Sequence, residues 1–191
     1  MINKRNPIIR EIDMKLSDLT INEYSFKLAD KKSTPGGGSA LALVLELACD
    51  LGIMVCNFTI DKIGYEQFNE EVSSIKDRLQ EFKLLAHDLI DKDAEAYQNV
   101  MDAFKSKNKD DISKASIFAC KVPYSLYVTT QKVEEYCERL YLIGNKNLIS
   151  DAKIGKDLCK SIYQGCLDNI KCNVNNIEDK KEREFYLDIL K

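Results

Sequence analysis

The chain has 191 residues, of which 45% are hydrophobic, and a formal net charge of −3. This length is sufficient for one domain with a substantial core, so we expect residues 1–191 to form a single domain. The small net charge favours neither nucleic acid nor an anionic membrane as a partner. No uninterrupted apolar run reaches the ~18 residues of a membrane span, and Met1 to Glu11 lack the apolar core of a signal peptide.

The cysteines and the histidine do not follow a metal-binding pattern. The seven cysteines form no C-x-x-C pair, and His87 is the single histidine. Structural zinc sites need closely spaced Cys and His ligands, so we expect no metal site. An odd number of cysteines spread along helical segments predicts buried free thiols in a reducing compartment, the cytoplasm.

The first helix is expected from Leu16 to Asp30, because Thr20 and Glu23 have the spacing of a capping box. A glycine-rich loop follows at residues 33–40 and contains Pro35, Gly36, Gly37, Gly38 and Ser39. Proline restricts its own φ, and glycine leaves no Cβ in the way of an approaching group. Ser39 is expected to cap a helix beginning near Ala40, whose free amides would attract an anion or a polarised carbonyl. The alternative is a tight turn that only lets two helices touch.

The second helix is expected from Ala40 to about Thr59. Apolar residues cover nearly its whole circumference, which is typical of a buried central helix. Glu46 and Asp50 interrupt this pattern four residues apart, on one face. Either they face a wet cleft or a basic partner, or this face reaches solvent.

After a break at Gly64, a periodic run extends from Glu66 to about Lys105. Its apolar residues step by four and three in a heptad-like seam, which comprises Phe68, Val72, Ile75, Leu79, Phe82, Ala86 and Leu89. A helix of this length would span ~60 Å, so we expect a bend or break.

The next seam position is occupied by Asp93, where the pattern requires a hydrophobic residue. A carboxylate buried there needs donors or a cation, or its pKa is raised and it can exchange protons. Alternatively, Asp93 is a partnered core residue or is exposed by drift of the helix axis. Asp91 should point elsewhere.

The second half of the chain is also helical. Asp110 or Asp111 is expected to cap a helix that Pro123 kinks or breaks near Val122 and that Gly144 ends. Ser150 or Asp151 should cap the next helix, and Asp151 is also an ordinary first-turn residue. A turn at residues 173–176 precedes a charged final helix, Ile177 to Leu190.

No strand pattern of useful length is present. We therefore expect an all-α, antiparallel bundle of about six helices. Its excess of apolar surface predicts a homodimer in which part of the seam meets the partner.

Taken in order, these motifs resemble the cyclodeaminase/cyclohydrolase family of folate one-carbon enzymes, the C-terminal part of formiminotransferase-cyclodeaminase. The resemblance runs from about Leu16 to Leu190. It rests on Thr34-Pro35-Gly36-Gly37-Gly38-Ser39; on Met54-Val55, Asn57-Phe58-Thr59, Lys62 and Tyr65; on Asp91-x-Asp93-Ala94-x-Ala96-Tyr97 with Val100-Met101 and Ala103; on Val122-Pro123; and on Gly144-Asn145-x-Asn147 with Ser150-Asp151-Ala152.

The resemblance implies an all-helical homodimer with a folate groove lined by the glycine loop and the Asp93 helix. It implies one of two reactions. A cyclodeaminase closes 5-formiminotetrahydrofolate to 5,10-methenyltetrahydrofolate and releases ammonia, whereas a cyclohydrolase interconverts 5,10-methenyl- and 10-formyltetrahydrofolate. Both reactions pass through a tetrahedral carbon between N5 and N10 and need proton transfer, with no cofactor beyond tetrahydrofolate.

The resemblance also suggests roles for individual residues. Asp93 is expected to be the general acid/base, with Lys62 and Asp151 as further catalytic residues. Lys62 would pair with the glutamate tail or hold Asp93 ionised; otherwise it is a solvated loop lysine. The expected substrate-binding residues are Pro35, Gly36, Gly37, Gly38, Ser39, Tyr65, Tyr97 and Asn145. Asp151 and Asn145 would line this site if the last interhelical loop folds back on it.

The chain departs from the family pattern at three places. Asp61 stands where relatives usually have glycine before the lysine, Lys105-Ser106-Lys107 replaces Leu-Pro-Lys, and Glu46 and Asp50 replace small apolar residues. The alternatives to an enzyme are a catalytically silent helical dimer that binds a folate-like ligand or a protein partner, and a purely structural bundle.

Overall fold

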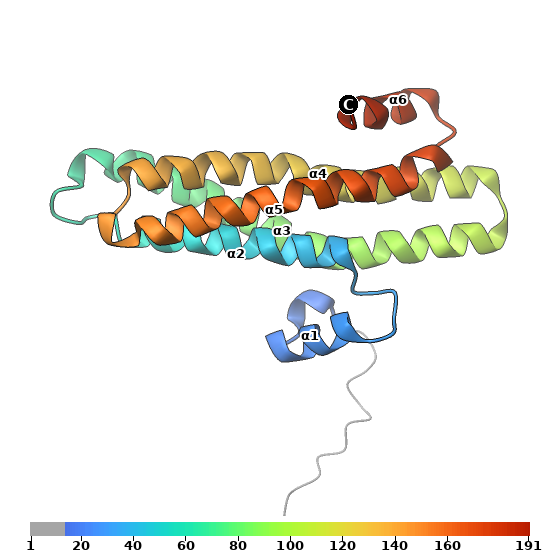
Figure 1. Ribbon diagram of the computed structural model, residues 1–191, viewed down its shortest axis with the longest axis horizontal. Helices are drawn as coiled ribbons and strands as arrows, with labels where there is room; N and C mark the ends of the chain where they lie inside the picture. Colours follow the sequence, from blue (N-terminus) through green and yellow to red (C-terminus); the bar gives the residue numbers. More distant parts are fainter. Residues whose placement is uncertain (1–13) are drawn as a thin grey trace, which may run out of the picture.

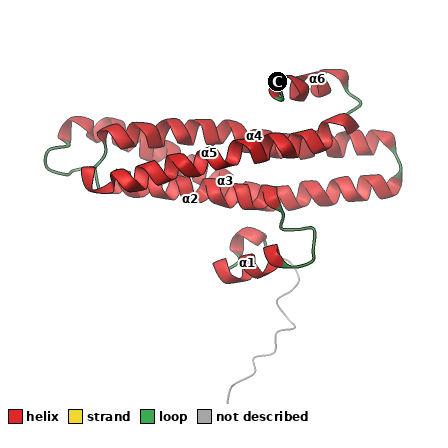
Figure 2. Cartoon of the chain, in the orientation of Figure 1, coloured by secondary structure: helices red, strands yellow, loops and turns green. Residues whose placement is uncertain are grey.

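The computed structural model describes residues 14–191, and within this range every regular element is helical. The all-α expectation is therefore confirmed for the described part of the chain (Figure 2). The elements, with 3₁₀ turns written η, are η2 Leu16–Asp18, α1 Ile21–Ala29, α2 Gly37–Asn57, η3 Glu66–Phe68, α3 Asn69–Ser106, α4 Lys109–Ile143, η4 Lys146–Leu148, α5 Ile149–Asn173, η5 Val174–Asn176 and α6 Lys180–Ile189.

Four long helices form the body of the molecule, and both α2 and α4 pack on all three others (Figure 1). The α2–α3 and α4–α5 connections meet at one end of this body, because the Asn145 amide group donates to the Phe58 carbonyl over 2.9 Å. The short helices α1 and α6 lie outside the body on opposite sides (Figure 1).

Helix α2 is the central helix that its composition predicts. Leu45, Ala48, Cys49, Val55 and Cys56 are fully buried. By length and composition alone α2 could also cross a membrane, since its mean hydropathy reaches 2.0. This is weak evidence of a span, because the core helix of a soluble protein has the same composition.

The seam of α3 packs inside the chain. Val72, Leu79 and Ala86 are fully buried, and Ile75 and Leu89 nearly so. Helix α3 runs from Asn69 to Ser106 without the expected break. Exposed apolar side chains on α3 are Leu84 in its middle and Tyr97, Met101 and Phe104 towards its far end.

Some expected helix boundaries were wrong. The first helix is divided, because Leu19 and Thr20 have extended backbones; the Thr20–Glu23 capping box then starts α1. Helix α4 is continuous through the buried Pro123, since its packing on α3 and α5 offsets the hydrogen bond that proline cannot make.

Several expected caps also differ. Asn108, not Asp110 or Asp111, caps α4, because its side chain accepts from the Asp110 amide. Neither Ser150 nor Asp151 caps α5, which already begins at Ile149 after the η4 turn. The final helix begins only at Lys180, where Asp179 is the N-cap.

Six of the seven cysteines are buried free thiols, as expected, and Cys172 is exposed. Burial alone explains why the pKa of Cys120 is raised to about 12.

Candidate active site

The glycine-rich loop begins helix α2, although not at the expected residue. Gly36 is the N-cap and the helix starts at Gly37, so Ser39 lies in the first turn instead of capping it. Ser39 is completely buried, and its hydroxyl lies 2.9 Å from the Tyr24 hydroxyl of α1. The serine side chain thus binds α1, while its backbone amide remains free to act at the helix start.

That backbone amide holds the seam carboxylate. The Ser39 N–H donates to Asp93 Oδ2 over 2.9 Å, so α3 is joined to the first turn of α2. The other carboxylate oxygen stands over Gly38: a Cβ built on Gly38 would lie 2.0 Å from Asp93 Oδ1. Glycine is therefore required here by close approach, as the sequence suggested for this loop in general.

The pKa of Asp93 is raised above the usual range of aspartate. Burial is the larger cause, and the hydrogen bond from the Ser39 amide opposes it in part. Asp91 points elsewhere, as expected: its carboxylate accepts from the Leu16 amide and the Ser17 hydroxyl, both over 2.6 Å. The two neighbouring aspartates thus differ in role, since Asp91 anchors η2 and Asp93 faces the glycine loop.

A cavity of about 350 Å³ lies beside Asp93. Its walls come from the glycine loop, the Asp93 turn of α3, Ala119 of α4 and the last turns of α5. The described lining residues are Ser33, Thr34, Gly36, Gly37, Gly38, Asp93, Ala96, Tyr97, Val100, Ala119, Asn169, Cys172 and Asn173. The structure therefore brings together the loop glycines, Asp93 and Tyr97 from the predicted set, with the buried Pro35 and Ser39 directly behind them.

The sequence reasoning missed the three cavity residues that α5 contributes, Asn169, Cys172 and Asn173, and Ala119 of α4. The α5 residues lie three and four residues apart and so share one face of α5. This polar stripe near the end of an otherwise apolar helix face was the available signal. Asn169 Nδ2 would lie 3.0 Å from a Cβ on Gly38, on the same side as the Asp93 carboxylate.

The other predicted site residues lie at the opposite end of α2. Lys62 and Tyr65 belong to the α2–α3 connection, and the Tyr65 hydroxyl accepts from the Lys146 amide over 2.9 Å. Asn145 is buried there, where its backbone N–H donates to Thr59 Oγ1 over 2.9 Å. Asp151 is in the first turn of α5. The 21 residues of α2 span about 30 Å, so within one chain these residues do not reach Asp93.

Two of the departures from the family pattern contain a residue with a left-handed backbone. Asp61 has a φ of 57°, the left-handed region that glycine adopts readily, and its amide donates to Asn69 Oδ1 over 3.0 Å. Lys107 ends α3 with a φ of 59°.

The two acids of α2 meet basic partners on α3 and do not line the cavity. His87 Nδ1 lies 3.2 Å from a Glu46 carboxylate oxygen, and Lys83 donates to Asp50 over 2.7 Å. Of the alternatives left open for these acids, the structure therefore shows a basic partner.

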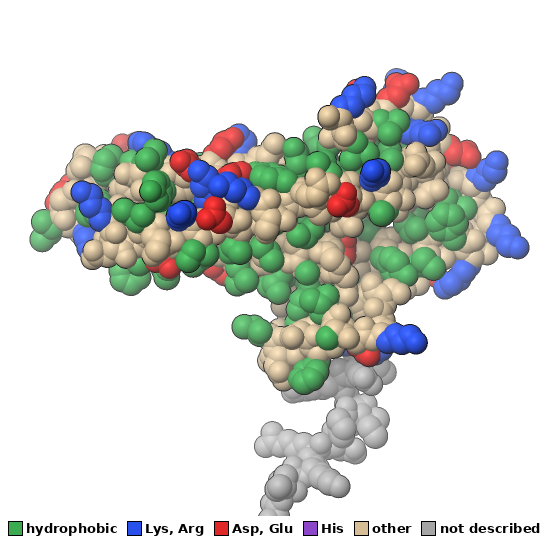
Figure 3. All heavy atoms as spheres, in the orientation of Figure 1, with side chains coloured by type: hydrophobic (Ala, Val, Ile, Leu, Met, Phe, Trp, Pro, Cys, Tyr) green, Lys and Arg blue, Asp and Glu red, His purple; other side chains and the backbone are tan. Residues whose placement is uncertain are grey.

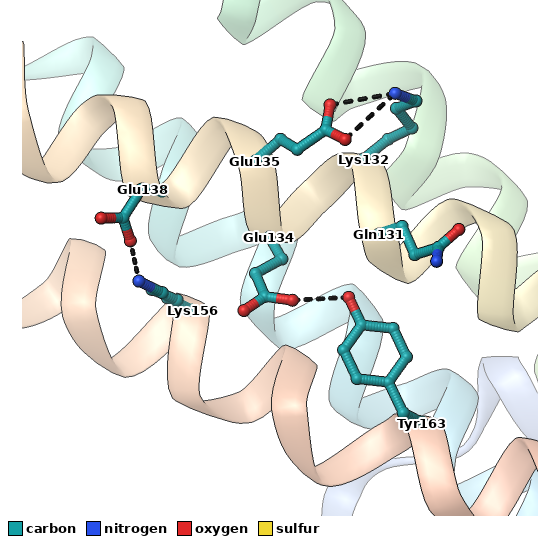
Figure 4. A pocket seen from close by; sticks show the side chains of 7 residues that line it. All are labelled: Gln131, Lys132, Glu134, Glu135, Glu138, Lys156 and Tyr163. Atoms are coloured by element: carbon teal, nitrogen blue, oxygen red, sulfur yellow. Dashed lines mark hydrogen bonds and ion pairs between the residues drawn. The ribbon is translucent and has the colours of Figure 1, made fainter.

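A second, larger cavity of about 470 Å³ lies between α4 and α5 (Figure 4). Its charged groups point toward one another: Tyr163 donates to Glu134 over 2.6 Å, Lys132 pairs with Glu135 over 3.0 Å, and Lys156 pairs with Glu138. Because these groups are already paired, we regard the Asp93 cavity as the stronger candidate for chemistry.

The fold and this cavity define an all-helical protein with a candidate small-molecule site where the start of its central helix meets a half-buried acid. Residues 20–189 match the family model described as formiminotransferase-cyclodeaminase, and the chain belongs to this family. The resemblance found in the sequence motifs is thereby confirmed.

Two relatives support this assignment. The chain is 28% identical over 170 residues to a methenyltetrahydrofolate cyclohydrolase of Methylorubrum extorquens, and the match covers 84% of this chain and 82% of that protein. It is also similar to the crystal structure of a formiminotetrahydrofolate cyclodeaminase from Thermotoga maritima, with a TM-score of 0.87 and 35% identity. That match covers 92% of this chain and 88% of the other.

Proposed function

We propose that the protein is a folate one-carbon enzyme, either a formiminotetrahydrofolate cyclodeaminase or a methenyltetrahydrofolate cyclohydrolase. The observation that carries this proposal is Asp93: a half-buried carboxylate with a raised pKa, held by the Ser39 amide at the edge of a cavity. The protein would act in the cytoplasm as an antiparallel helical bundle of one domain, residues 1–191, and as a homodimer. Tetrahydrofolate, the one-carbon carrier, would be its only cofactor.

Asp93 would serve as the general acid/base in either reaction. In the cyclodeaminase, N10 attacks the formimino carbon, Asp93 takes the N10 proton, and a proton is returned to the amino nitrogen that leaves as ammonia. In the cyclohydrolase, Asp93 takes a proton from the attacking water and delivers it to N5 as the N5–carbon bond breaks, and the remaining hydroxyl proton passes to solvent as the formyl C=O forms. A raised pKa suits both directions, and a positioned acid/base typically contributes 10²–10⁴-fold in rate.

The loop glycines and Tyr97 would receive the ring system of the folate. The amides at the start of α2 favour a carbonyl or an anion, and Tyr97 offers an aromatic face from the next turn after Asp93. Lys62, Tyr65, Asn145 and Asp151 would contribute from the other end of the bundle. Since that end is about 30 Å away along α2, their contribution requires a second chain.

The test is to offer the purified protein 5-formiminotetrahydrofolate and 5,10-methenyltetrahydrofolate separately. Ammonia release with the appearance of the methenyl absorbance identifies a cyclodeaminase, and loss of that absorbance identifies a cyclohydrolase. Asp93→Asn should lower either activity 10²–10⁴-fold. Tight folate binding without turnover of either substrate would show instead a silent binding protein.

A further inference from the structure

The last turns of α5 place a carboxamide beside the Asp93 carboxylate. A Cβ built on Gly38 would lie 2.0 Å from Asp93 Oδ1 and 3.0 Å from Asn169 Nδ2. Because both distances start from one point, the two polar atoms are no more than about 5 Å apart, a gap that one heteroatom can bridge with two hydrogen bonds of ordinary length. Both residues line the cavity, which opens on the face drawn in Figure 3, where the surface is hollowed between the end of α5 and the start of α2.

The carboxamide of Asn169 is available to a ligand. Within residues 14–191 its side chain has no hydrogen-bond partner, whereas the Ser39 amide already holds the Oδ2 atom of Asp93. The amino group of Asn169 is the end nearer to Gly38 and the acid. This orientation is the favourable one, because a carboxamide oxygen, which can only accept, would be repelled by the carboxylate. Asn169 therefore presents a hydrogen-bond donor beside Asp93 Oδ1.

The backbone that carries Asn169 is held in place. Its carbonyl accepts from Asn173 Nδ2 over 3.1 Å in the last turn of α5. The next residue, Ile170, is fully buried, and its carbonyl accepts from the Cys120 thiol of α4 over 3.6 Å. A donor on such a turn is positioned before the substrate arrives, which is the condition under which a donor lowers an activation barrier.

From this geometry we propose that Asn169 is a further catalytic residue, whose Nδ2–H donates to the heteroatom of the one-carbon unit while Asp93 exchanges the proton. This inference rests on the proposed function. In the cyclodeaminase the heteroatom is the imino nitrogen of the formimino group. In ring closure of 10-formyltetrahydrofolate it is the formyl oxygen, which enters as water in the reverse direction. As N10 or N5 forms its bond to the carbon, the π electrons of the C=N or C=O bond move onto this heteroatom, and a donor already in place stabilises them.

The rest of the cavity leaves this role to a neutral donor. None of its described lining residues is Lys, Arg or His, so within residues 14–191 no cation of the same chain stands at the reacting carbon. Tyr97 lies one turn further along α3 than Asp93. Asn169 is thus the side-chain donor that the structure places next to the acid, and it comes from a different helix, so the two groups can hold one atom between them.

Asn169→Leu tests this role, because leucine has a similar size and no donor. We expect kcat to fall about 10²–10³-fold, the loss that is usual when one such donor is removed. The affinity for tetrahydrofolate, which lacks the one-carbon unit, should stay close to that of the wild type, because Asn169 is assigned no contact with the rest of the folate. Asn175→Leu, at an exposed position outside the cavity, is the matched control and should keep the wild-type kcat.

The kcat of each variant is measured with 5-formiminotetrahydrofolate and with 5,10-methenyltetrahydrofolate, and the Kd of tetrahydrofolate by calorimetric titration. Asn169→Ala, which also lacks the donor and suits a helix, repeats the test if leucine disturbs α5, and urea unfolding shows which variants are folded. A wild-type kcat in a folded Asn169 variant would overturn the inference. So would a loss of tetrahydrofolate affinity as large as the loss of kcat, since Asn169 would then only shape the cavity. A wild type that turns over neither substrate would instead refute the proposed function, and this inference with it.

Discussion

Two features of the Asp93 environment shift its pKa in opposite directions: its burial and its hydrogen bond at the start of helix α2. Burial raises the pKa of its carboxyl, and the Ser39 N–H lowers it by a smaller amount. An acid whose pKa is raised in the folded protein favours folding while it is protonated. It loses that contribution as the pH rises through its folded-state pKa.

Asp93→Asn should therefore become more stable than the wild type as the pH rises. Below about pH 4, near the ordinary pKa of aspartate, both proteins carry a neutral side chain there and should unfold at similar urea concentrations. At pH 7 the wild type bears the cost of the buried charge and the variant does not, while the Asn oxygen can still accept from Ser39. Urea unfolding at the two pH values measures the difference.

Asp91→Asn is the matched control for this measurement. The Asp91 carboxylate accepts two short hydrogen bonds from η2, so at pH 7 its replacement should destabilise the protein by about 1–3 kcal/mol. The same sign for both variants would contradict the distinction between these neighbouring aspartates.

Gly38→Ala should displace the Asp93 carboxylate. Its Cβ would meet Asp93 Oδ1 at 2.0 Å, which is too close, so the acid would have to leave its position beside the Ser39 amide. We expect a fall in kcat of at least 10²-fold, the lower limit for losing a general acid/base. At Gly37 a Cβ meets nothing within 4 Å, so Gly37→Ala isolates the effect of a stiffer loop and should cost much less in kcat.

At the scale of elements, the connections at the far end of the bundle are held by buried polar contacts. Asn145 joins the α4–α5 connection to the end of α2: its N–H donates to Thr59 Oγ1 and its side chain to the Phe58 carbonyl. These bonds give Asn145 a structural role that is independent of substrate. They also fix the Lys62 connection, which follows directly on Thr59.

Asn145→Ala should destabilise the protein by about 1–3 kcal/mol, because it leaves the partly buried Phe58 carbonyl without its donor. Asn147→Ala is the control, since Asn147 is exposed and its recorded contact uses only the backbone amide. Chemical denaturation of both variants measures the cost. Equal stability of the two variants would show that the Phe58 contact contributes nothing to folding.

The local elements could largely be predicted from the sequence, and the assembly of the site could not. The Thr20 capping box, the α3 seam and the break at Gly64 follow from short-range patterns that the structure repeats. Asp93 was also identified in this way, because an acid that interrupts a heptad-like apolar pattern can be recognised from the sequence alone. The glycine loop was located correctly, but the role of Ser39 was not, since its hydroxyl is bound by Tyr24 from another element.

The rest of the site depends on which ends of the helices meet. Asn169, Cys172 and Asn173 reach the cavity only because α5 ends beside the start of α2. Lys62 and Asn145 occur in the same family motifs as Asp93, yet the fold separates them by the length of α2. Neither the contribution of α5 to the cavity nor the separation of Lys62 and Asn145 from Asp93 can be read from residue spacing along the chain.

At the scale of the whole molecule, the exposed Leu47 of α2 and the exposed Ile21 and Phe26 of α1 would link stability to association in the proposed homodimer. If folding and dimerisation are coupled, the thermal midpoint should rise with protein concentration, as mass action requires. Calorimetry over a hundredfold range of concentration measures this shift. A Leu47→Glu variant, which places a charge on the exposed side of α2, should show a lower midpoint that does not depend on concentration, and a concentration-independent wild type would argue against coupled association.

Ser39 contacts two residues from different helices, Tyr24 of α1 and Asp93 of α3. Its hydroxyl lies within hydrogen-bonding distance of Tyr24 on α1, the helix that would contact a second chain, and its amide donates to Asp93, the proposed proton-transfer group. If dilution separates the two chains and loosens α1, the position of Asp93 would therefore change before the helical bundle unfolds. Turnover per enzyme molecule would then fall at low enzyme concentration while the helix content stays unchanged, and one buried serine would link the two.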